Sequence, residues 1–203
     1  MNIYKLHTDP EQLTGYEQRL QVPKFAYEEV RDELTKHRSA DDVRKATEHL
    51  QDVLLKDPKY AYLYAKVVME DRWPAAEDII KTVPHWAYLY TRFLLRGDRW
   101  PEAEKTILTD PTAAAKYADY VLYDRWPEAE SIIATDAEAS ASYAENVLDG
   151  RFKMGEHTIM KEPDIARSYA RNIIGGRWPE AEIWIKEDDF EWMRYKHDLG
   201  FGG

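Results

Sequence analysis

The chain has 203 residues, a formal net charge of −10 and no cysteine. The lack of cysteine excludes disulfides, thiolate metal sites and cysteine nucleophiles. It also agrees with a reducing compartment, so we expect a cytoplasmic protein. No segment approaches the roughly 18 consecutive apolar residues of a membrane span, and residues 1–9 lack the apolar core of a secretory signal. We therefore expect no membrane contact.

The acidic charge lies mainly beyond residue 45. Residues 1–45 hold 8 basic and 9 acidic side chains, and the remaining 158 hold 20 and 29. Nonspecific binding to nucleic acid depends on clustered Lys and Arg, so we expect no direct nucleic-acid binding. The charge indicates a solvated surface or, alternatively, a partner with a basic face.

Residues 1–45 are predicted to form an N-terminal helical cap. Asp9 followed by Pro10 is a helix-start signal, and a second helix is expected over residues 22–36. Ser39 and Asp42 resemble a capping box, which predicts a third helix over residues 40–55. A separate binding module is the alternative reading of this region.

A six-residue motif, Arg-Trp-Pro-Glu-Ala-Glu or close to it, recurs beyond the cap. It begins at Arg72, Arg99, Arg125 and Arg177, and a divergent copy without Trp or Pro begins at Arg151. The spacings are 27, 26, 26 and 26 residues, and such a fixed period is typical of a repeat array. Residues 50–54 align with residues 103–107, which indicates a degenerate unit before the first motif.

Each unit is predicted to contain two short helices. The first opens at an acidic residue, at Pro, or at both, and its apolar stripe is centred on a recurring Tyr with a small residue three positions earlier. These tyrosines are Tyr64, Tyr90, Tyr117, Tyr143 and Tyr169. The first helix is expected to end at glycines before the Arg, namely Gly97, Gly150, Gly175 and Gly176.

The second helix begins at the Pro of the motif, which favours the first turn of a helix. At about two turns it is too short to be stable alone, so stacking must stabilise it. The predicted fold is therefore all-α, an α-solenoid of helix-turn-helix repeats over residues 46–188. Residues 189–203 are predicted to form a C-terminal capping helix and tail, whose aromatic residues either cover the last unit or dock into a partner.

The copies of the motif have nearly the same residues, and this near-identity admits two interpretations. Its arginines could contact successive ligand groups and its tryptophans could be exposed platforms. Alternatively both could serve packing, the Arg through a structural ion pair with Glu between neighbouring units and the Trp as a wedge. We favour packing, because a binding array varies where it contacts its ligand. These structural positions are Arg72, Trp73, Arg99, Trp100, Arg125, Trp126, Arg177 and Trp178.

The sites four and two residues before the recurring Tyr vary between units. The first two units place Tyr60, Tyr62, Trp86 and Tyr88 there. If exposed, these aromatic residues would form a protein-binding surface, since Tyr and Trp dominate such sites. If they pack against the N-terminal cap, they belong to the core.

Catalytic and cofactor signals are weak. The six histidines show no metal-ligand spacing, and no glycine-rich loop has a nucleotide-binding form. We expect no enzyme activity, no metal and no cofactor.

The Arg-Trp-Pro-Glu-Ala-Glu copies, with the Tyr-Ala-x-x-Val segments between them, resemble short helical repeats in proteins of large tailed bacteriophages. The resemblance covers about residues 46–188; the likeness to tetratricopeptide-type solenoids is looser, because those units are longer. The resemblance to the phage proteins implies a phage-encoded accessory protein in the cytoplasm of an infected bacterium, and it transfers no catalytic residue.

The leading hypothesis is a noncatalytic scaffold that binds a protein, such as a host or defence factor. The alternatives are a structural or self-assembling homo-oligomer, associating through Trp192, Tyr195 and Phe201, and an acidic decoy of a nucleic-acid-binding protein.

Overall fold

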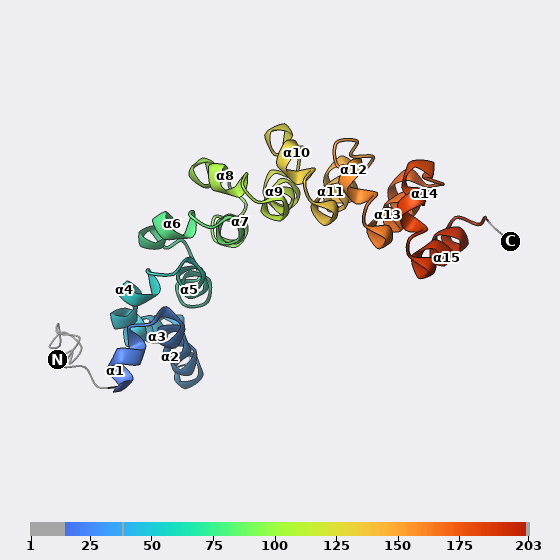
Figure 1. The fold of residues 1–203 in the computed structure, drawn as a ribbon. Helices are drawn as coiled ribbons and strands as arrows, with labels where there is room; N and C mark the ends of the chain where they lie inside the picture. The colour runs from blue at the N-terminus through green and yellow to red at the C-terminus, as the bar shows by residue number, and fades with distance from the viewer. Residues whose placement is uncertain (1–14, 38, 202–203) are drawn as a thin grey trace. The chain divides into compact units, whose positions relative to one another are not determined.

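The computed structural model describes residues 15–37 and 39–201, and all regular elements within these ranges are helical (Figure 1). The predicted all-α helical repeat fold is confirmed. The expected helix start at Asp9-Pro10 lies outside the described residues. The fold divides into two compact units, Met1–Ala103 and Glu104–Gly203, a division that the repeat pattern does not predict.

The N-terminal helices agree in part with those expected from the sequence. They are α1 (Gly15–Leu20), α2 (Pro23–Lys36), α3 (Ala40–Thr47) and α4 (Gln51–Leu54). The Ser39 side chain accepts a hydrogen bond from the Asp42 N–H, as the capping box predicts. The single helix expected over residues 40–55 is wrong, because a 3₁₀ turn at Glu48–Leu50 separates α3 from α4. Helix α4 takes the place of the second helix in the degenerate unit.

The predicted helix pairs follow in both units. The first helices are α5 (Pro58–Tyr64), α7 (Pro84–Phe93), α9 (Pro111–Tyr117), α11 (Ala137–Tyr143) and α13 (Pro163–Tyr169). The second helices are α6 (Pro74–Ile80), α8 (Pro101–Ile107), α10 (Pro127–Ile133), α12 (Glu156–Ile159) and α14 (Pro179–Ile185), and α15 (Asp189–Asp198) closes the series.

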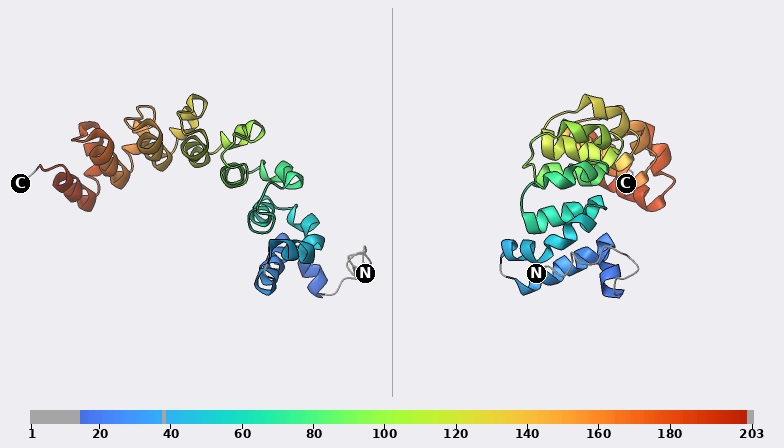
Figure 2. Two further views of the ribbon diagram at one scale, coloured as in Figure 1. Left: turned by 180° about the vertical axis from the view of Figure 1, so that it is seen from behind. Right: turned by 90° about the vertical axis from the view of Figure 1, so that its left-hand side faces the viewer.

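Most first helices begin at the N-cap residue that the sequence predicts. Asp57, Asp110 and Asp136 each accept a backbone hydrogen bond as N-cap residues, whereas the Glu162 side chain makes no such bond. Within each compact unit, the first helices pack side by side with α2 before them or α15 after them (Figure 2). The helices in this order are α2, α5 and α7 in one unit, and α9, α11, α13 and α15 in the other.

The core repeats with the period of the sequence. The recurring tyrosines are at most 2% exposed, and the small residues three positions earlier are fully buried. A small side chain at this position lets the neighbouring helix approach closely. The stripe predicted from the sequence is therefore the buried face of each first helix.

The first helices end differently from the glycine stop that we expected. Four of them widen into a π-helical turn, at Ala65–Met69, Ala118–Leu122, Ala144–Leu148 and Ala170–Ile174. The residue six positions after the Tyr then adopts a left-handed conformation, and only the last unit places glycine there. These residues are Glu70, Arg96, Tyr123, Asp149 and Gly175. Gly150 and Gly176 follow the left-handed residue and have no positive φ.

The divergent copy at Arg151, which lacks the Trp and Pro of the motif, has an irregular structure. Its second helix, α12, is only 4 residues long. Gly155 replaces the Ala of the other copies, and a Cβ there would lie 2.4 Å from Ser140 Oγ. Ser140 itself replaces the Ala found at this position in the other first helices. The larger Ser140 and the smaller Gly155 thus compensate each other across the helix contact.

Candidate functional site

The motifs at Arg72, Arg125, Arg151 and Arg177 contain a two-pronged ion pair. Arg125 donates from Nε to Glu130 Oε1 at 2.5 Å and from Nη2 to Oε2 at 3.0 Å. The same geometry joins Arg72 to Glu77, Arg151 to Glu156 and Arg177 to Glu182. The pair closes within one motif, whereas we expected it to link neighbouring units.

The link between consecutive repeat units is the recurring Tyr. The Tyr143 hydroxyl accepts a hydrogen bond from the Trp126 N–H at 2.9 Å and donates one to Glu130 Oε1 at 3.2 Å. Its ring packs on Phe152 of its own unit, with ring centroids 5.2 Å apart. Tyr90, Tyr169 and Tyr195 make the equivalent two hydrogen bonds to the preceding motif.

The degenerate unit retains this link with different chemistry. The Tyr64 hydroxyl lies 3.1 Å from Thr47 Oγ1 and accepts a hydrogen bond from Gln51 Nε2 at 3.2 Å. Thr47 and Gln51 occupy the Trp and Glu positions of the motif, as the alignment of residues 50–54 with 103–107 implies.

The pKa shifts agree with a structural network. Hydrogen bonds from Arg125 and Arg177 hold the pKa of Glu130 and Glu182 below the usual range. Burial raises the pKa of Tyr143 and of Tyr169 to about 12. The carboxylates are therefore ionised and the hydroxyls protonated at neutral pH.

The motif tryptophans lie inside the fold. Trp73, Trp100, Trp126 and Trp178 are between 2% and 6% exposed, so their rings are packing wedges rather than exposed platforms. A groove of about 600 Å³ lies between the motifs at Arg72 and Arg99, but its rim mixes charges of both signs. The repeated motif therefore offers neither an accessible aromatic surface nor a ligand pocket of one charge.

The four aromatic residues proposed for partner binding also contribute to packing. Tyr62 and Tyr88 are each 2% exposed, and Tyr60 and Trp86 are half-buried. The Tyr62 ring lies 5.5 Å from that of Trp86, and the Tyr60 ring lies 5.7 Å from that of Tyr27 in α2. These variable positions pair consecutive first helices in the first unit.

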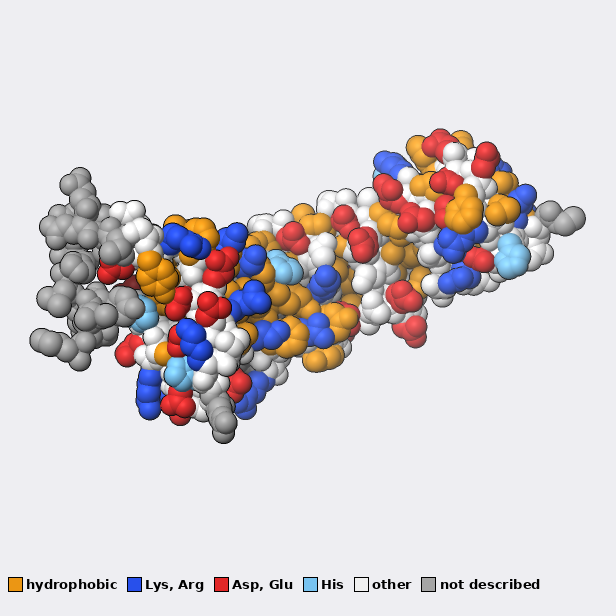
Figure 3. Space-filling model, turned by 90° about the horizontal axis from the view of Figure 1, so that it is seen from below, with side chains coloured by type: hydrophobic (Ala, Val, Ile, Leu, Met, Phe, Trp, Pro, Cys, Tyr) orange, Lys and Arg blue, Asp and Glu red, His pale blue; other side chains and the backbone are white. Residues whose placement is uncertain are grey.

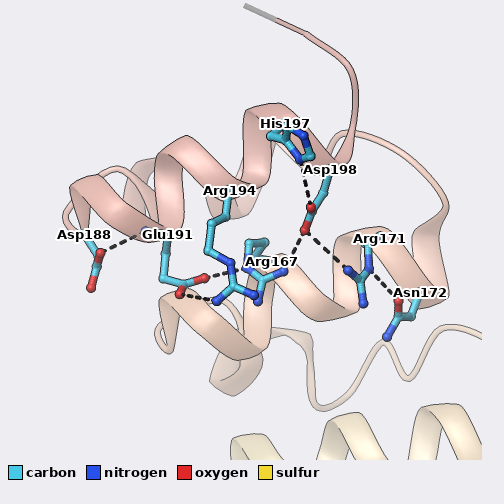
Figure 4. Close-up of polar contacts among 8 residues, drawn as sticks. All are labelled: Arg167, Arg171, Asn172, Asp188, Glu191, Arg194, His197 and Asp198. Carbon is cyan, nitrogen blue, oxygen red and sulfur yellow. Dashed lines mark hydrogen bonds and ion pairs between the residues drawn. The ribbon is translucent and has the colours of Figure 1, made fainter.

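An ion-pair cluster replaces that aromatic pair at the C-terminal end of the second unit (Figure 4). Arg167 stands two residues before Tyr169, and Glu191 four before Tyr195, the same positions as Tyr62 and Trp86. Arg167 Nε lies 2.5 Å from Glu191 Oε2, and Nη1 lies 2.7 Å from Asp198 Oδ2. The buried Arg167 thus fastens both ends of α15 to α13.

The aromatic residues proposed for self-association lie mostly against one another. Tyr195 is fully buried, Trp192 packs on it at 5.4 Å, and Phe201 contacts both rings. The Arg177 guanidinium lies 4.3 Å from the Phe201 ring centroid. On α14 and α15, the exposed apolar side chains are instead Ile183, Phe190 and Met193.

A partly exposed cluster lies beside the Tyr62–Trp86 pair of the first unit. Phe93 is 45% exposed, with Lys66 Nζ 4.1 Å and Arg92 Cζ 5.0 Å from its ring centroid. Arg92 also donates from Nη1 to the Tyr88 hydroxyl at 2.8 Å. We call Lys66, Arg92 and Phe93, with the hydroxyls of Tyr62 and Tyr88, the basic–aromatic cluster.

The face of the molecule seen from below has Lys and Arg side chains interspersed among hydrophobic ones (Figure 3). Sequence reasoning considered Tyr62 and Tyr88 but missed Lys66, Arg92 and Phe93. The signal was available two residues after the recurring Tyr, where the first unit has Lys66 and Arg92, whereas the second has Asp119 and Glu145 followed by Arg171.

Across residues 15–37 and 39–201, no group of three His, Cys, Asp or Glu side chains is arranged to hold a metal ion. No helix in these ranges is long and apolar enough to cross a membrane. Comparison with protein-family models, with curated proteins and with solved structures finds no match.

Proposed function

We propose that this chain is a noncatalytic protein–protein interaction scaffold whose binding face is the basic–aromatic cluster. The observation that carries the proposal is the placement of Phe93, which is 45% exposed between two cationic side chains. Aromatic residues and Arg dominate the energetics of protein interfaces. Among the described residues of the first unit, Tyr16 and Phe93 are the exposed large aromatic side chains.

The scaffold beneath the cluster supports this role. Phe93 and Arg92 lie on α7, and Lys66 lies in the π-helical turn after α5, so two packed helices present the three side chains. A binding site on packed helices needs little ordering when a partner arrives, which favours affinity.

The biological setting belongs to the same proposal. The likeness of the motif to repeats of tailed bacteriophages supports a phage-encoded accessory protein. In the cytoplasm of an infected bacterium, it would bind and modulate a host or defence factor.

Affinity capture from bacterial lysate with quantitative mass spectrometry tests the proposal. We expect the intact chain to capture a stoichiometric protein and Phe93→Ala to lose it with an unchanged circular dichroism spectrum. Lys105→Glu, an exposed charge reversal on α8, is the matched control and should retain the partner. Equal capture by the Phe93→Ala variant would contradict the assignment of the face.

A second candidate function is self-assembly through the C-terminal helices. It is favoured by Ile183, Phe190 and Met193, which are 67%, 59% and 57% exposed. The other regular copies of the motif place Asp78, Lys105 and Ser131 at the position of Ile183. Light scattering over a range of concentrations tests this function, since a constant monomer mass would exclude it.

A further inference from the structure

On the premise of the proposed function, the Tyr62 hydroxyl indicates the chemistry of the partner. This atom is buried and has no hydrogen-bond partner, and it is the one side-chain polar atom of this kind in the described ranges. A buried polar group without a partner is costly, and such groups are rare in native proteins.

The groups around this hydroxyl are cationic or hydrogen-bonding. The Tyr88 hydroxyl and the Arg92 guanidinium both interact electrostatically with the Tyr62 hydroxyl, and Lys66 Nζ lies 5.8 Å from the Tyr62 ring centroid. Burial raises the pKa of Tyr62 to about 12, with a further rise from Tyr88 and an opposing effect from Arg92. The hydroxyl is therefore protonated at neutral pH and can donate.

We propose that the basic–aromatic cluster binds a carboxylate side chain in an acidic segment of a partner protein. Lys66 and Arg92 supply positive charge, and the Tyr62 hydroxyl donates a hydrogen bond to the carboxylate. Phe93 packs on an apolar side chain next to the carboxylate in the segment. Since the hydroxyl is buried in the unbound chain, the nearby Lys66 and Arg92 side chains shift to admit the ligand.

The local charge favours a peptide over a nucleic acid. Residues 51–103 hold 8 basic and 8 acidic side chains, and Glu70 and Asp71 follow the π-helical turn that carries Lys66. A phosphate backbone needs a run of cations to neutralise successive phosphates. Interspersed charges with one exposed Phe suit a single carboxylate beside an apolar side chain instead.

The charge of the whole chain favours a different protein over a second copy. Residues 104–150 could supply carboxylates, since they hold 10 acidic and 3 basic side chains. Two copies would nevertheless each carry −10, and like net charges of that size repel each other. A partner with a local acidic segment is free of that overall repulsion.

Fluorescence anisotropy with the full chain tests the inference. The probe is a fluorescein-labelled peptide of glutamates around a central phenylalanine, and the comparison ligands are the same peptide with glutamines and a labelled oligothymidylate. We expect only the glutamate peptide to bind, with an affinity that falls as salt rises. Lys66→Glu should weaken binding about tenfold or more, and Lys105→Glu should leave it unchanged.

The Tyr62→Phe variant separates a binding role from a structural one. Loss of a hydrogen bond to a charged group should weaken peptide binding about tenfold. The thermal midpoint should stay the same or rise, because the variant removes a buried hydroxyl without a partner. Unchanged affinity in Tyr62→Phe would overturn the assignment of this hydroxyl as a donor to the ligand.

Other outcomes would overturn the inference in distinguishable ways. Equal binding of the glutamine peptide, or tighter binding of oligothymidylate, would show that the cluster does not select a carboxylate of a peptide. Self-association of the chain that is abolished by Lys66→Glu would identify a second copy as the occupant. If the glutamate peptide fails to bind while Phe93-dependent capture persists, the inference falls and the proposed function stands. If neither the glutamate peptide binds nor Phe93-dependent capture occurs, both the inference and the proposed function are overturned.

Discussion

The backbone nitrogen of Trp126 donates a hydrogen bond to the hydroxyl of Tyr143, 17 residues later in the chain, at 2.9 Å. The donor lies at the start of α10 and the acceptor near the end of α11, so one helix pair completes the hydrogen bonding of the pair before it. Because buried N–H groups need partners, these consecutive helix pairs are coupled by a hydrogen bond as well as by apolar contact.

Tyr143→Phe should therefore lower the free energy of unfolding by about 1–3 kcal/mol, because it leaves the buried Trp126 N–H without a partner. Urea denaturation followed by circular dichroism measures the change. Tyr123→Phe is the control, since that side chain is 78% exposed and should change stability by less than about 0.5 kcal/mol. Equal stability of the two variants would contradict the coupling.

The motif carboxylates predict how stability depends on pH. Glu130 and Glu182 have a lowered pKa in the folded state, chiefly through hydrogen bonds from Arg125 and Arg177. Their contribution is therefore complete above the unfolded pKa of about 4.5 and is lost as pH falls through the lower folded values. Urea denaturation between pH 7 and pH 3 should show this loss. A Glu130→Gln variant should lose less stability over that range, and an identical slope would argue against the pair.

Gly155 should tolerate no larger side chain. Gly155→Ala brings a Cβ within 2.4 Å of Ser140 Oγ and 2.7 Å of Phe152 Cδ1. We expect a loss of about 1–3 kcal/mol of stability from this overpacking, measured by thermal or urea denaturation. Gly150→Ala is the matched control, because its added Cβ meets only the Leu148 carbonyl oxygen at 3.7 Å.

At the left-handed positions that end the first helices, removing glycine and introducing glycine should have opposite effects on stability. Gly175→Ala should cost about 1 kcal/mol, because φ is 68° and residues with a Cβ disfavour this left-handed conformation. The cost comes from the backbone conformation alone, since the added Cβ meets no atom of the surrounding structure within 4 Å. Tyr123→Gly, at the equivalent position, should stabilise the chain by up to about 1 kcal/mol. Gly176→Ala serves as the control with no positive φ. Stabilisation by Gly175→Ala would contradict the assigned backbone conformation.

The buried ion pair under α15 predicts a large single-mutant effect. Arg167 and Glu191 are 5% and 7% exposed, so Arg167→Leu leaves carboxylates without their buried partner. We expect a loss of about 3–5 kcal/mol, with faster hydrogen exchange in α15. The double variant Arg167→Leu, Glu191→Leu should recover much of the stability, which a double-mutant cycle measures.

The sequence predicted what depends on local chemistry. Pro74 and its equivalents mark the second helices, Asp57 and Asp110 cap first helices, and the recurring Tyr identifies the buried stripe. Each of these signals acts within one or two helical turns. A period of 26 residues then suffices to predict an all-helical repeat fold.

What the sequence did not predict depends on contacts between distant residues. The two ends of the Trp126–Tyr143 bond lie in different helix pairs, so no local pattern reveals it. The left-handed conformation at Tyr123 follows from the chain reversal after a π-helical turn, and the residue type opposes it. The same holds for the candidate site, since Lys66 and Phe93 meet only when α5 and α7 pack together.

The constant Tyr-to-motif bonds also have a consequence for how such a gene could change in length. Duplication or loss of 26 codons among the regular copies would pair each Tyr with an equivalent motif, whereas Tyr64 pairs with Thr47 and Gln51 instead. The variable pairs between first helices restrict this freedom. Ala115 and Ala139, both buried, are interchangeable neighbours, but Tyr62 needs Trp86 and Arg167 needs Glu191. The array is thus free to grow in its middle and is constrained in the order of its ends.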